Sequence, residues 1–325
     1  MNFINKNRGD EEENIRLLSS FQNQFPYKIQ ALYHIRDNVF KIITTKGVFV
    51  LKGYSSYSRL KLQETFSSSL RKEGFKNTYS FISLDQDPII HQNKYFGCLE
   101  FIEPNYRPFS YVNKKERQEG LALLDEFHRI TQQSVRVYQS ILPEYDIQTK
   151  WTERRNQFFQ NKDTISKYVP SEMISEWLYW ADWSLEGIQK NIQKIKEEFP
   201  VILHGDVAHH NFLRRKDGKL FLIDFDLISI GPRSMDLLQY ANRTLPFMNW
   251  DLKLLSQYKN LNSLLSKEVY IYALVYPTDL FREWNRLLRD GFELDGFRIQ
   301  QVMNQSFHQM EYRRNFITEL MKLTI

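Results

Sequence analysis

The residues best suited to chemistry in this chain are two aspartates and an asparagine in two short motifs. Asp206 stands in the sequence His-Gly-Asp, Asn211 follows it five positions later, and Asp224 follows Asn211 by thirteen positions in the sequence Ile-Asp-Phe-Asp. A strong turn over residues 216–219 separates two short β-type runs, so we expect it to return Asp224 near Asn211. Carboxylate and amide oxygens are ligands that Mg²⁺ takes in proteins.

The interval between Asp206 and Asn211 is that of a kinase catalytic loop, D-x-x-x-x-N. In that loop the aspartate accepts the proton of the substrate hydroxyl and the asparagine binds magnesium. Beyond these groups, phosphoryl transfer needs little more than positioning and charge neutralisation. A polar turn is the alternative for the His-Gly-Asp sequence alone, but the interval to Asn211 and the strand ending at Asp224 favour a catalytic site.

Histidines in the same segment allow a different metal chemistry. His204, Asp206, His209 and His210 are four potential ligands within seven residues, as a zinc or two-metal hydrolase would need. This alternative leaves the interval to Asn211 unexplained, and we therefore favour phosphoryl transfer.

Strand signals dominate the first hundred residues and helix signals the rest. Residues 28–52 carry β-branched and aromatic runs with a hairpin turn at Lys46-Gly47, whereas residues 58–72 have apolar side chains at helical spacing. Residues 80–85 and 94–102 are predicted as a further strand pair. From about residue 103 the pattern is mostly helical, with an embedded hairpin that ends at Asp224. The sequence thus predicts a β-rich part joined near residue 102 to a larger helical part.

Composition narrows the class of protein. The chain has 325 residues, enough for two domains, with 42% hydrophobic and 26% charged residues. Its net charge of +5 comes from basic residues interleaved with acidic ones, which does not indicate nucleic-acid binding. A single cysteine, Cys98, fits a reducing compartment. No signal peptide is visible and the apolar stretch 269–281 is too short for a membrane span, so we expect a cytoplasmic protein.

The two motifs resemble a known family. His-Gly-Asp with Asn211, followed by Ile-Asp-Phe-Asp, looks like the Brenner-type motif pair of the aminoglycoside phosphotransferase and choline kinase superfamily. VFVLKGY (48–54), EGLALLDEFHRIT (119–131) and LVYPTDLFREW (274–284) resemble further segments of it. With these segments and an Ile-Asp-Phe-Asp rather than an Ile-Asp-x-Glu ending, the chain looks most like the CotS-type spore coat kinases of spore-forming Bacillus relatives, in the YutH-like branch. The resemblance implies an α+β, bilobal protein-kinase-like fold with a nucleotide-binding N-lobe (1–102) and a catalytic, acceptor-binding C-lobe (103–325).

By this resemblance Asp206 is the catalytic base, and Asn211 and Asp224 hold Mg²⁺. Asp226 is either a second acidic ligand or a residue that orders the loop. Asp236 resembles a downstream acid that hydrogen-bonds the catalytic loop, although an acid at a helix N-terminus is equally consistent with its position.

The nucleotide site is expected in the N-lobe. Lys52 would pair with the α- and β-phosphates of ATP, and Glu64 in the following helix could hold its ammonium group as in kinases, with Glu73 as the alternative. The adenine is expected between the lobes near Glu100 and Ile102. Residues 34–40, between the first two strands, contain no glycine, so no glycine-rich phosphate loop is visible.

Two functions follow from these observations. The first is an ATP- and Mg²⁺-dependent phosphotransferase acting on a hydroxyl of an unknown small-molecule acceptor. The second is a weakly active or inactive kinase-fold protein with a structural role in spore coat assembly, recruited from the cytoplasm by other coat proteins. The glycine-free segment supports the second, and the retained Asp206, Asn211, Asp224 and Lys52 support the first.

Two acids near the C-terminus bear on the acceptor. Asp279 and Glu283 are four residues apart on a predicted helix and share a face. In relatives an acidic wall there can receive cationic substrates, and a solvated helix face is the alternative.

Overall fold

The computed structural model describes residues 18–84, 87–289 and 296–324. Contacts divide the chain into unit 1 (Met1–Pro108 with Phe212–Asp226) and unit 2 (Phe109–Asn211 with Leu227–Ile325). The described part of unit 1 is mostly β-structure and that of unit 2 is mostly helical, as the α+β fold class predicts. The predicted domain boundary at residue 102 stays a prediction.

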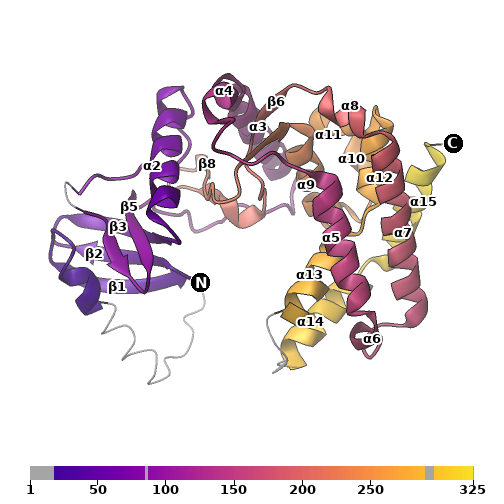
Figure 1. Cartoon of the computed structure of the whole chain (residues 1–325), viewed down its shortest axis with the longest axis horizontal. Coiled ribbons are helices and arrows are strands. Elements are labelled where there is room, and N and C mark those ends of the chain that lie inside the picture. The colour runs from indigo at the N-terminus through magenta and orange to yellow at the C-terminus, as the bar shows by residue number, and fades with distance from the viewer. Residues whose placement is uncertain (1–17, 85–86, 290–295, 325) are drawn as a thin grey trace. The chain divides into compact units, whose positions relative to one another are not determined.

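Unit 1 is built on a five-stranded sheet with the order β1-β2-β3-β5-β4, in which all neighbours are antiparallel. The predicted hairpin is present, with Thr44 of β2 paired to Gly47 of β3. Its two-residue turn is Thr45-Lys46, one position earlier than the predicted Lys46-Gly47, and Gly47 is the first residue of β3. Helix α2 lies against the sheet (Figure 1). The elements of unit 1 are β1 (Ile29–Arg36), β2 (Val39–Thr44), β3 (Gly47–Tyr54), α2 (Tyr57–Lys72), β4 (Ile89–His91), β5 (Lys94–Glu100), β7 (Phe212–Arg214) and β8 (Leu220–Leu222).

The outer edge of β5 differs from the prediction. A strand was expected over residues 80–85, but over residues 80–84 the structure has only an isolated bridge, between Phe81 and Leu99, and residue 85 lies outside the described residues. The cause is that two segments share this edge: β4 pairs with the first half of β5, and hydrogen bonds from Ile82 to Cys98 and from Glu100 to Ser80 occupy the second half.

Helix α2 begins and packs as its sequence dictates. The side chain of Ser56 caps it by accepting a hydrogen bond from the backbone N–H of Arg59. Leu60, Phe66 and Leu70 recur at helical spacing and are buried. The first residue of α2 and the face that it buries are therefore both fixed. Together they determine the direction in which each side chain of α2 points.

Aromatic rings fill the core of unit 1. Phe21 is fully buried and makes edge-to-face contacts with Phe40 at 5.5 Å and with Phe96 at 5.0 Å between ring centroids. Cys98 belongs to the same cluster, and burial raises the pKa of its thiol to about 12. The thiol is thus protonated and inert at neutral pH.

Unit 2 is a set of packed helices with one two-stranded sheet, in which β6 pairs with β9. In the part of the chain that the structure describes, no helix combines the length and the apolar character needed to span a membrane. The elements of unit 2 are α3 (Lys114–Thr131), η1 (Gln132–Ser134), α4 (Val135–Tyr138), α5 (Ile147–Gln160), α6 (Lys162–Ile165), α7 (Ser171–Lys190), α8 (Ile192–Lys196), β6 (Pro200–Leu203), η2 (His209–Asn211), β9 (Ser229–Pro232), α9 (Ser234–Thr244), η3 (Leu245–Met248), α10 (Leu252–Ser256), α11 (Lys259–Leu265), α12 (Glu268–Val275), α13 (Thr278–Arg289), α14 (Gly296–Phe307) and α15 (Met310–Lys322).

The aromatic core of unit 1 yields a stability prediction. Phe21→Ala should lower the free energy of unfolding by about 3–5 kcal/mol, because it removes a buried ring and leaves a cavity. Phe199→Ala, at a side chain that is 81% exposed, should change it by less than about 0.5 kcal/mol. Urea unfolding of the two variants measures the difference, and equal losses would contradict the assignment of Phe21 to the core.

Candidate catalytic site

The loop that carries Asp206 follows β6 in unit 2 and depends on a glycine. Gly205 has a φ of +78°, and a Cβ atom there would lie 2.2 Å from the carbonyl oxygen of Leu227. Only glycine fits this conformation and this close approach. The loop therefore turns sharply and leaves the Asp206 side chain accessible, with 29% of its surface exposed.

A buried carboxylate anchors this loop. Asp236, near the start of α9, accepts hydrogen bonds from the backbone N–H groups of His204 at 2.7 Å and Gly205 at 3.0 Å. Nε2 of His128 lies 2.8 Å from the same carboxylate and must donate to it, because an ionised carboxylate only accepts. Burial raises the pKa of Asp236, but His128 and His204 lower it by more, so the carboxyl pKa lies below its ordinary value. The predicted hydrogen bonds from the loop that carries Asp206 to Asp236 are confirmed.

Helix α9 and the loop after Pro108 hold the other side of the turn. Gln239 accepts from the N–H of Val207 at 2.7 Å and donates to the carbonyl of Gly205 at 2.9 Å. The Tyr111 hydroxyl donates to the carbonyl of Val207 at 2.5 Å. Asp206 thus projects from a backbone that is fixed on both sides.

Asp206 and Asn211 are brought together. The Asn211 amide donates to the carbonyl oxygen of Asp206 at 2.8 Å and to its carboxylate at 3.2 Å. Asn211 is 1% exposed, and its Oδ1 has no hydrogen-bond partner among the described residues. A buried amide oxygen without a partner is unfavourable unless a cation or a water satisfies it. The other Asp206 oxygen lies 3.2 Å from the guanidinium of Arg243, a contact that no local motif indicates.

In unit 1, the β7–β8 hairpin leads to Asp224 as predicted, with Phe212 paired to Leu222. Asp224 has a φ of +74°, an uncommon conformation for a residue other than glycine and one that often marks functional sites. Its carboxylate lies 2.5 Å from the Lys52 ammonium and 2.6 Å from the guanidinium of Arg36. Burial raises the pKa of Asp224, but Lys52 and Arg36 outweigh it and hold this pKa well below the ordinary range.

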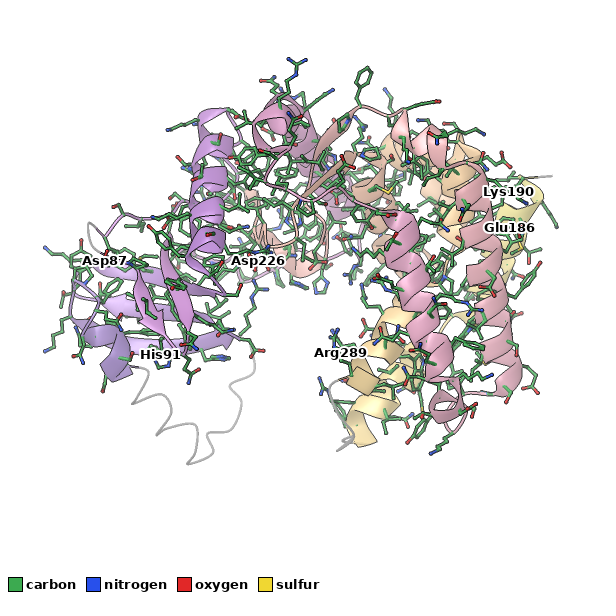
Figure 2. All side chains as sticks on the ribbon, viewed as in Figure 1. Asp87, His91, Glu186, Lys190, Asp226 and Arg289 are labelled. Carbon is green, nitrogen blue, oxygen red and sulfur yellow. The ribbon has the colours of Figure 1, made fainter. Side chains whose placement is uncertain are left out.

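Helix α2 holds the segment around Phe225 in place. Gln63 donates to the carbonyl of Phe225 at 2.8 Å, and Arg59 donates to that of Asp226. The Phe225 ring is fully buried and meets Phe66 edge-to-face at 5.3 Å between centroids. Asp226, labelled in Figure 2, contributes one carboxylate oxygen to a 2.8 Å ion pair with Lys52. Its other oxygen has no hydrogen-bond partner in the described chain.

Glu64 does not pair with Lys52. Among the described residues the Lys52 ammonium pairs with Asp224 and Asp226, and Glu64 pairs with Lys61 of its own helix at 2.7 Å. The physical reason is helical register, because Gln63 is the buried residue of α2 that faces the Asp224–Asp226 segment. The expected Lys52–Glu64 pair is therefore absent, and a role of Glu64 in nucleotide binding stays a prediction.

Glu100 and Ile102 lie at and just beyond the end of β5. The backbone N–H of Glu100 donates to Ser80, and its carboxylate accepts from the Ser80 hydroxyl at 2.8 Å. Ile102 is buried, with 8% of its surface exposed. Their place beside an adenine stays a prediction.

Sequence reasoning missed Arg36, which lies at the end of β1 beside the glycine-free segment. No motif marked it, because its partner Asp224 is 188 positions away. Asn38 in that turn has a φ of +58°, as expected for an asparagine that takes the place of glycine.

The histidine cluster is not assembled as a metal centre. Within residues 18–84, 87–289 and 296–324, no group of three or more histidine, cysteine or acidic side chains is arranged to hold a metal ion. His204 is fully buried, and its Nδ1 accepts the backbone N–H of Asp206 at 3.3 Å. This ring orders the loop, which argues against the hydrolase alternative.

Comparisons with known proteins fit this geometry. Residues 106–263 match the APH model, described as the phosphotransferase enzyme family. None of the curated protein sequences compared with the chain matches it.

Three solved structures are similar over almost the whole chain. An aminoglycoside phosphotransferase from Alicyclobacillus acidocaldarius subsp. acidocaldarius DSM 446 has a TM-score of 0.69 at 17% identity, covering 93% of this chain and 94% of that one. The GDP and kanamycin complex of APH(2″)-IIIa has a TM-score of 0.60 at 12% identity, covering 93% and 99%. The AMP-bound complex of spectinomycin phosphotransferase, APH(9)-Ia, has a TM-score of 0.58 at 14% identity, covering 92% and 98%. The predicted α+β, kinase-like fold is confirmed. For the superfamily predicted from the motifs, the finding that agrees is the family match over residues 106–263.

The anchoring of the loop predicts a pH-dependent loss of stability. Asp236→Asn should lower the free energy of unfolding by about 1–3 kcal/mol, because its amide cannot accept all three N–H groups. The folded pKa of Asp236 is depressed, so its contribution is present above the unfolded pKa, about 3.9, and is lost as the pH falls through the folded value. Urea unfolding from pH 7 to pH 3 should therefore show the difference between variant and parent shrinking in acid. A constant difference would contradict the ionised state of Asp236.

Proposed function

We propose, from the match of residues 106–263 to the phosphotransferase enzyme family, that this chain transfers the γ-phosphoryl group of ATP to a hydroxyl of a small molecule. The observation that carries the proposal is the arrangement of Asp206 and Asn211, 3.2 Å apart on a loop held by buried Asp236. One side chain offers a partly exposed carboxylate, and the other offers a buried amide oxygen with no partner in the described chain.

In the proposed reaction the acceptor oxygen forms a bond to the γ-phosphorus of ATP. The bond from that phosphorus to the β,γ-bridging oxygen breaks, and ADP leaves with its electron pair. The hydroxyl proton passes to the carboxylate of Asp206. The products are ADP and the phosphorylated acceptor. The main contribution of the protein to the reaction rate is that Asp206 positions the hydroxyl.

The donor set suits Mg²⁺, which would neutralise charge on the phosphate oxygens when bound with the nucleotide. Asn211 and Asp224 are the residues proposed to hold it. The unpartnered Oδ1 of Asn211 and the ionised state of Asp224 support this assignment. Lys52, buried and already held by two carboxylates, is proposed to contact the α- and β-phosphates.

One observation favours a second candidate, a weakly active or inactive protein with a structural role. Both oxygens of Asp224 are engaged by Lys52 and Arg36, and the neighbouring turn contains no glycine. A metal ion on Asp224 has to compete with Lys52 and Arg36 for the same two oxygens, which weakens its binding. We rank this candidate second, because a purely structural protein has no need for an Asn211 oxygen left without a partner.

We also propose an association with the spore coat, which rests on the resemblance of segments 48–54, 119–131 and 274–284, together with the Ile-Asp-Phe-Asp ending, to the CotS-type kinases. A fluorescent fusion expressed in a sporulating host should then move from the cytoplasm to the forming coat. A chain carrying Asp206→Asn that still restores coat assembly would favour the structural role.

Asp224→Ala should abolish stabilisation by MgATP, because it removes a proposed metal ligand. The parent protein should gain about 2.7 kcal/mol at a ligand concentration one hundred times the dissociation constant. Thermal unfolding with and without millimolar MgATP measures this gain in each variant. Asp217→Ala, in the turn of the same hairpin, is the matched control and should keep it. Absence of a shift in the parent protein would refute the proposal.

Asp206→Asn should lower kcat by about a hundredfold to ten-thousandfold, because the amide cannot take the hydroxyl proton. The affinity for MgATP should stay unchanged. Release of ADP in the presence of an acceptor measures turnover, and Asp182→Asn, at an exposed acid of the same unit, is the control. Full activity in Asp206→Asn would exclude it as the base.

A further inference from the structure

Lys52 has more carboxylate partners than its proposed task allows it to keep. Its ammonium group lies 2.5 Å from a carboxylate oxygen of Asp224 and 2.8 Å from one of Asp226, and 9% of its side chain is exposed. The proposed function assigns Asp224 to the metal ion. Once that carboxylate binds a metal, Asp226 is the one acid among the described residues that still forms an ion pair with Lys52.

A buried ammonium group without a carboxylate partner is unfavourable. Removal of one member of a buried ion pair leaves an uncompensated charge, which strongly destabilises a protein. An ammonium group has three N–H donors, of which Asp224 and Asp226 occupy two. With Asp226 in place and Asp224 on a metal, two donors are free for phosphate oxygens and the charge of Lys52 stays balanced.

The backbone around Asp226 is fixed by helix α2. The carbonyl of Phe225 accepts a hydrogen bond from Gln63 at 2.8 Å, and the carbonyl of Asp226 accepts one from Arg59. The Phe225 ring is fully buried. Asp226 therefore follows a buried anchor directly, with its backbone bonded to α2 and its carboxylate on Lys52.

Helix α2 also contains the alternative partner, Glu64, but the structure directs that side chain elsewhere. Glu64 pairs with Lys61 of the same helix at 2.7 Å, and 29% of its side chain is exposed. The buried residue beside it is Gln63, whose amide cannot balance a charge. Neighbouring residues of a helix point about 100° apart. To bring Glu64 into the place of Gln63, α2 would have to rotate by that angle and lose its contact with Phe225.

We infer that Asp226 is the positioning residue for Lys52: its carboxylate holds the ammonium group while that group contacts the nucleotide phosphates. A glutamate of the helix has this task in protein kinases. The inference rests on the proposed function and deepens it. Residues 224–226 then control two parts of the site, since they carry both the proposed metal ligand and the partner of Lys52. Helix α2 acts on the site through the hydrogen bonds that hold this segment.

Asp226→Asn tests the inference by calorimetry with ADP, once in excess EDTA and once with Mg²⁺. The variant should bind ADP about tenfold more weakly than the parent protein in both conditions, because Lys52 is then drawn to Asp224 and away from the phosphates. Charge repulsion alone predicts the opposite, since removal of a carboxylate favours an anion. The unpartnered Oδ1 of Asp226 makes a second metal ligand the competing assignment, and a metal ligand would weaken binding only with Mg²⁺ present.

A double-variant comparison shows whether Asp226 acts through Lys52. In a Lys52→Met background, Asp226→Asn should change the affinity for ADP by less than about twofold, because the group that it positions is gone. Asp226→Glu keeps the charge and should restore the affinity to within about threefold of the parent value. Glu64→Gln is the matched control, at an acid of the same unit that pairs with Lys61. It should bind ADP like the parent protein.

A crystal structure of the parent protein with MgADP gives a readout that needs no variant, and it decides if Asp226→Asn does not fold. The Asp226 carboxylate should lie within hydrogen-bond distance of the Lys52 ammonium. Glu64 in that position overturns the inference, and so does Asp226 bound to the metal.

Three binding results also overturn the inference. Equal losses from Asp226→Asn with Lys52 and with Met at position 52 assign Asp226 a merely structural role. A loss confined to Mg²⁺ conditions assigns it to the metal, and tighter binding of ADP leaves charge repulsion as its effect. Each of these results leaves the phosphotransferase proposal intact, whereas a parent protein that binds no nucleotide refutes both.

Discussion

The carboxylate of Asp236 is the group on which the geometry of the proposed catalytic loop depends. It is almost completely buried, and a buried charge is tolerated only where hydrogen bonds replace the lost water. Three N–H groups supply this replacement, from His128 on α3 and from the backbone of His204 and Gly205. The same bonds tie α3, α9 and the end of β6 together, so the direction in which Asp206 projects is fixed by the packing of unit 2.

A second charge balance organises unit 1. Lys52 is buried, and two carboxylates offset its desolvation. Asp224, held in a left-handed conformation, takes Arg36 as a further partner. A glycine-rich loop would bring backbone N–H groups to phosphates, whereas here an arginine stands beside the segment that lacks glycine. Guanidinium groups are suited to phosphate oxygens, so the charge that a glycine-free turn cannot supply through its backbone is present on a side chain.

Much of this arrangement could be predicted because it is local in sequence. The β2–β3 hairpin, α2 and the β7–β8 hairpin follow from periodicity and turn residues within short windows. The pairing of Asn211 with Asp206 follows from an interval of five residues. Contacts over long separations were not predictable: Arg36 meets Asp224 across 188 positions, and Gln63 rather than Glu64 faces Phe225 because of helical register. The strand predicted to begin at residue 80 was wrong over residues 80–84, because strand propensity does not reveal which segment occupies a shared sheet edge.

Contacts over long sequence separations also decide how charged residues are interpreted. Asp279 and Glu283 share a helix face, and that pattern alone is equally consistent with a solvated surface and with a site for cations. The ion-pair partners of the two acids decide between these alternatives. Arg313, which is 34 positions from Asp279, pairs with both oxygens of Asp279. Arg282 and Arg286 pair with the oxygens of Glu283. An acid that is paired in this way has little field left for a ligand. The electrostatic character of a site is therefore set by the charges that the fold leaves uncompensated, and the sequence pattern of the acids alone does not reveal which charges these are.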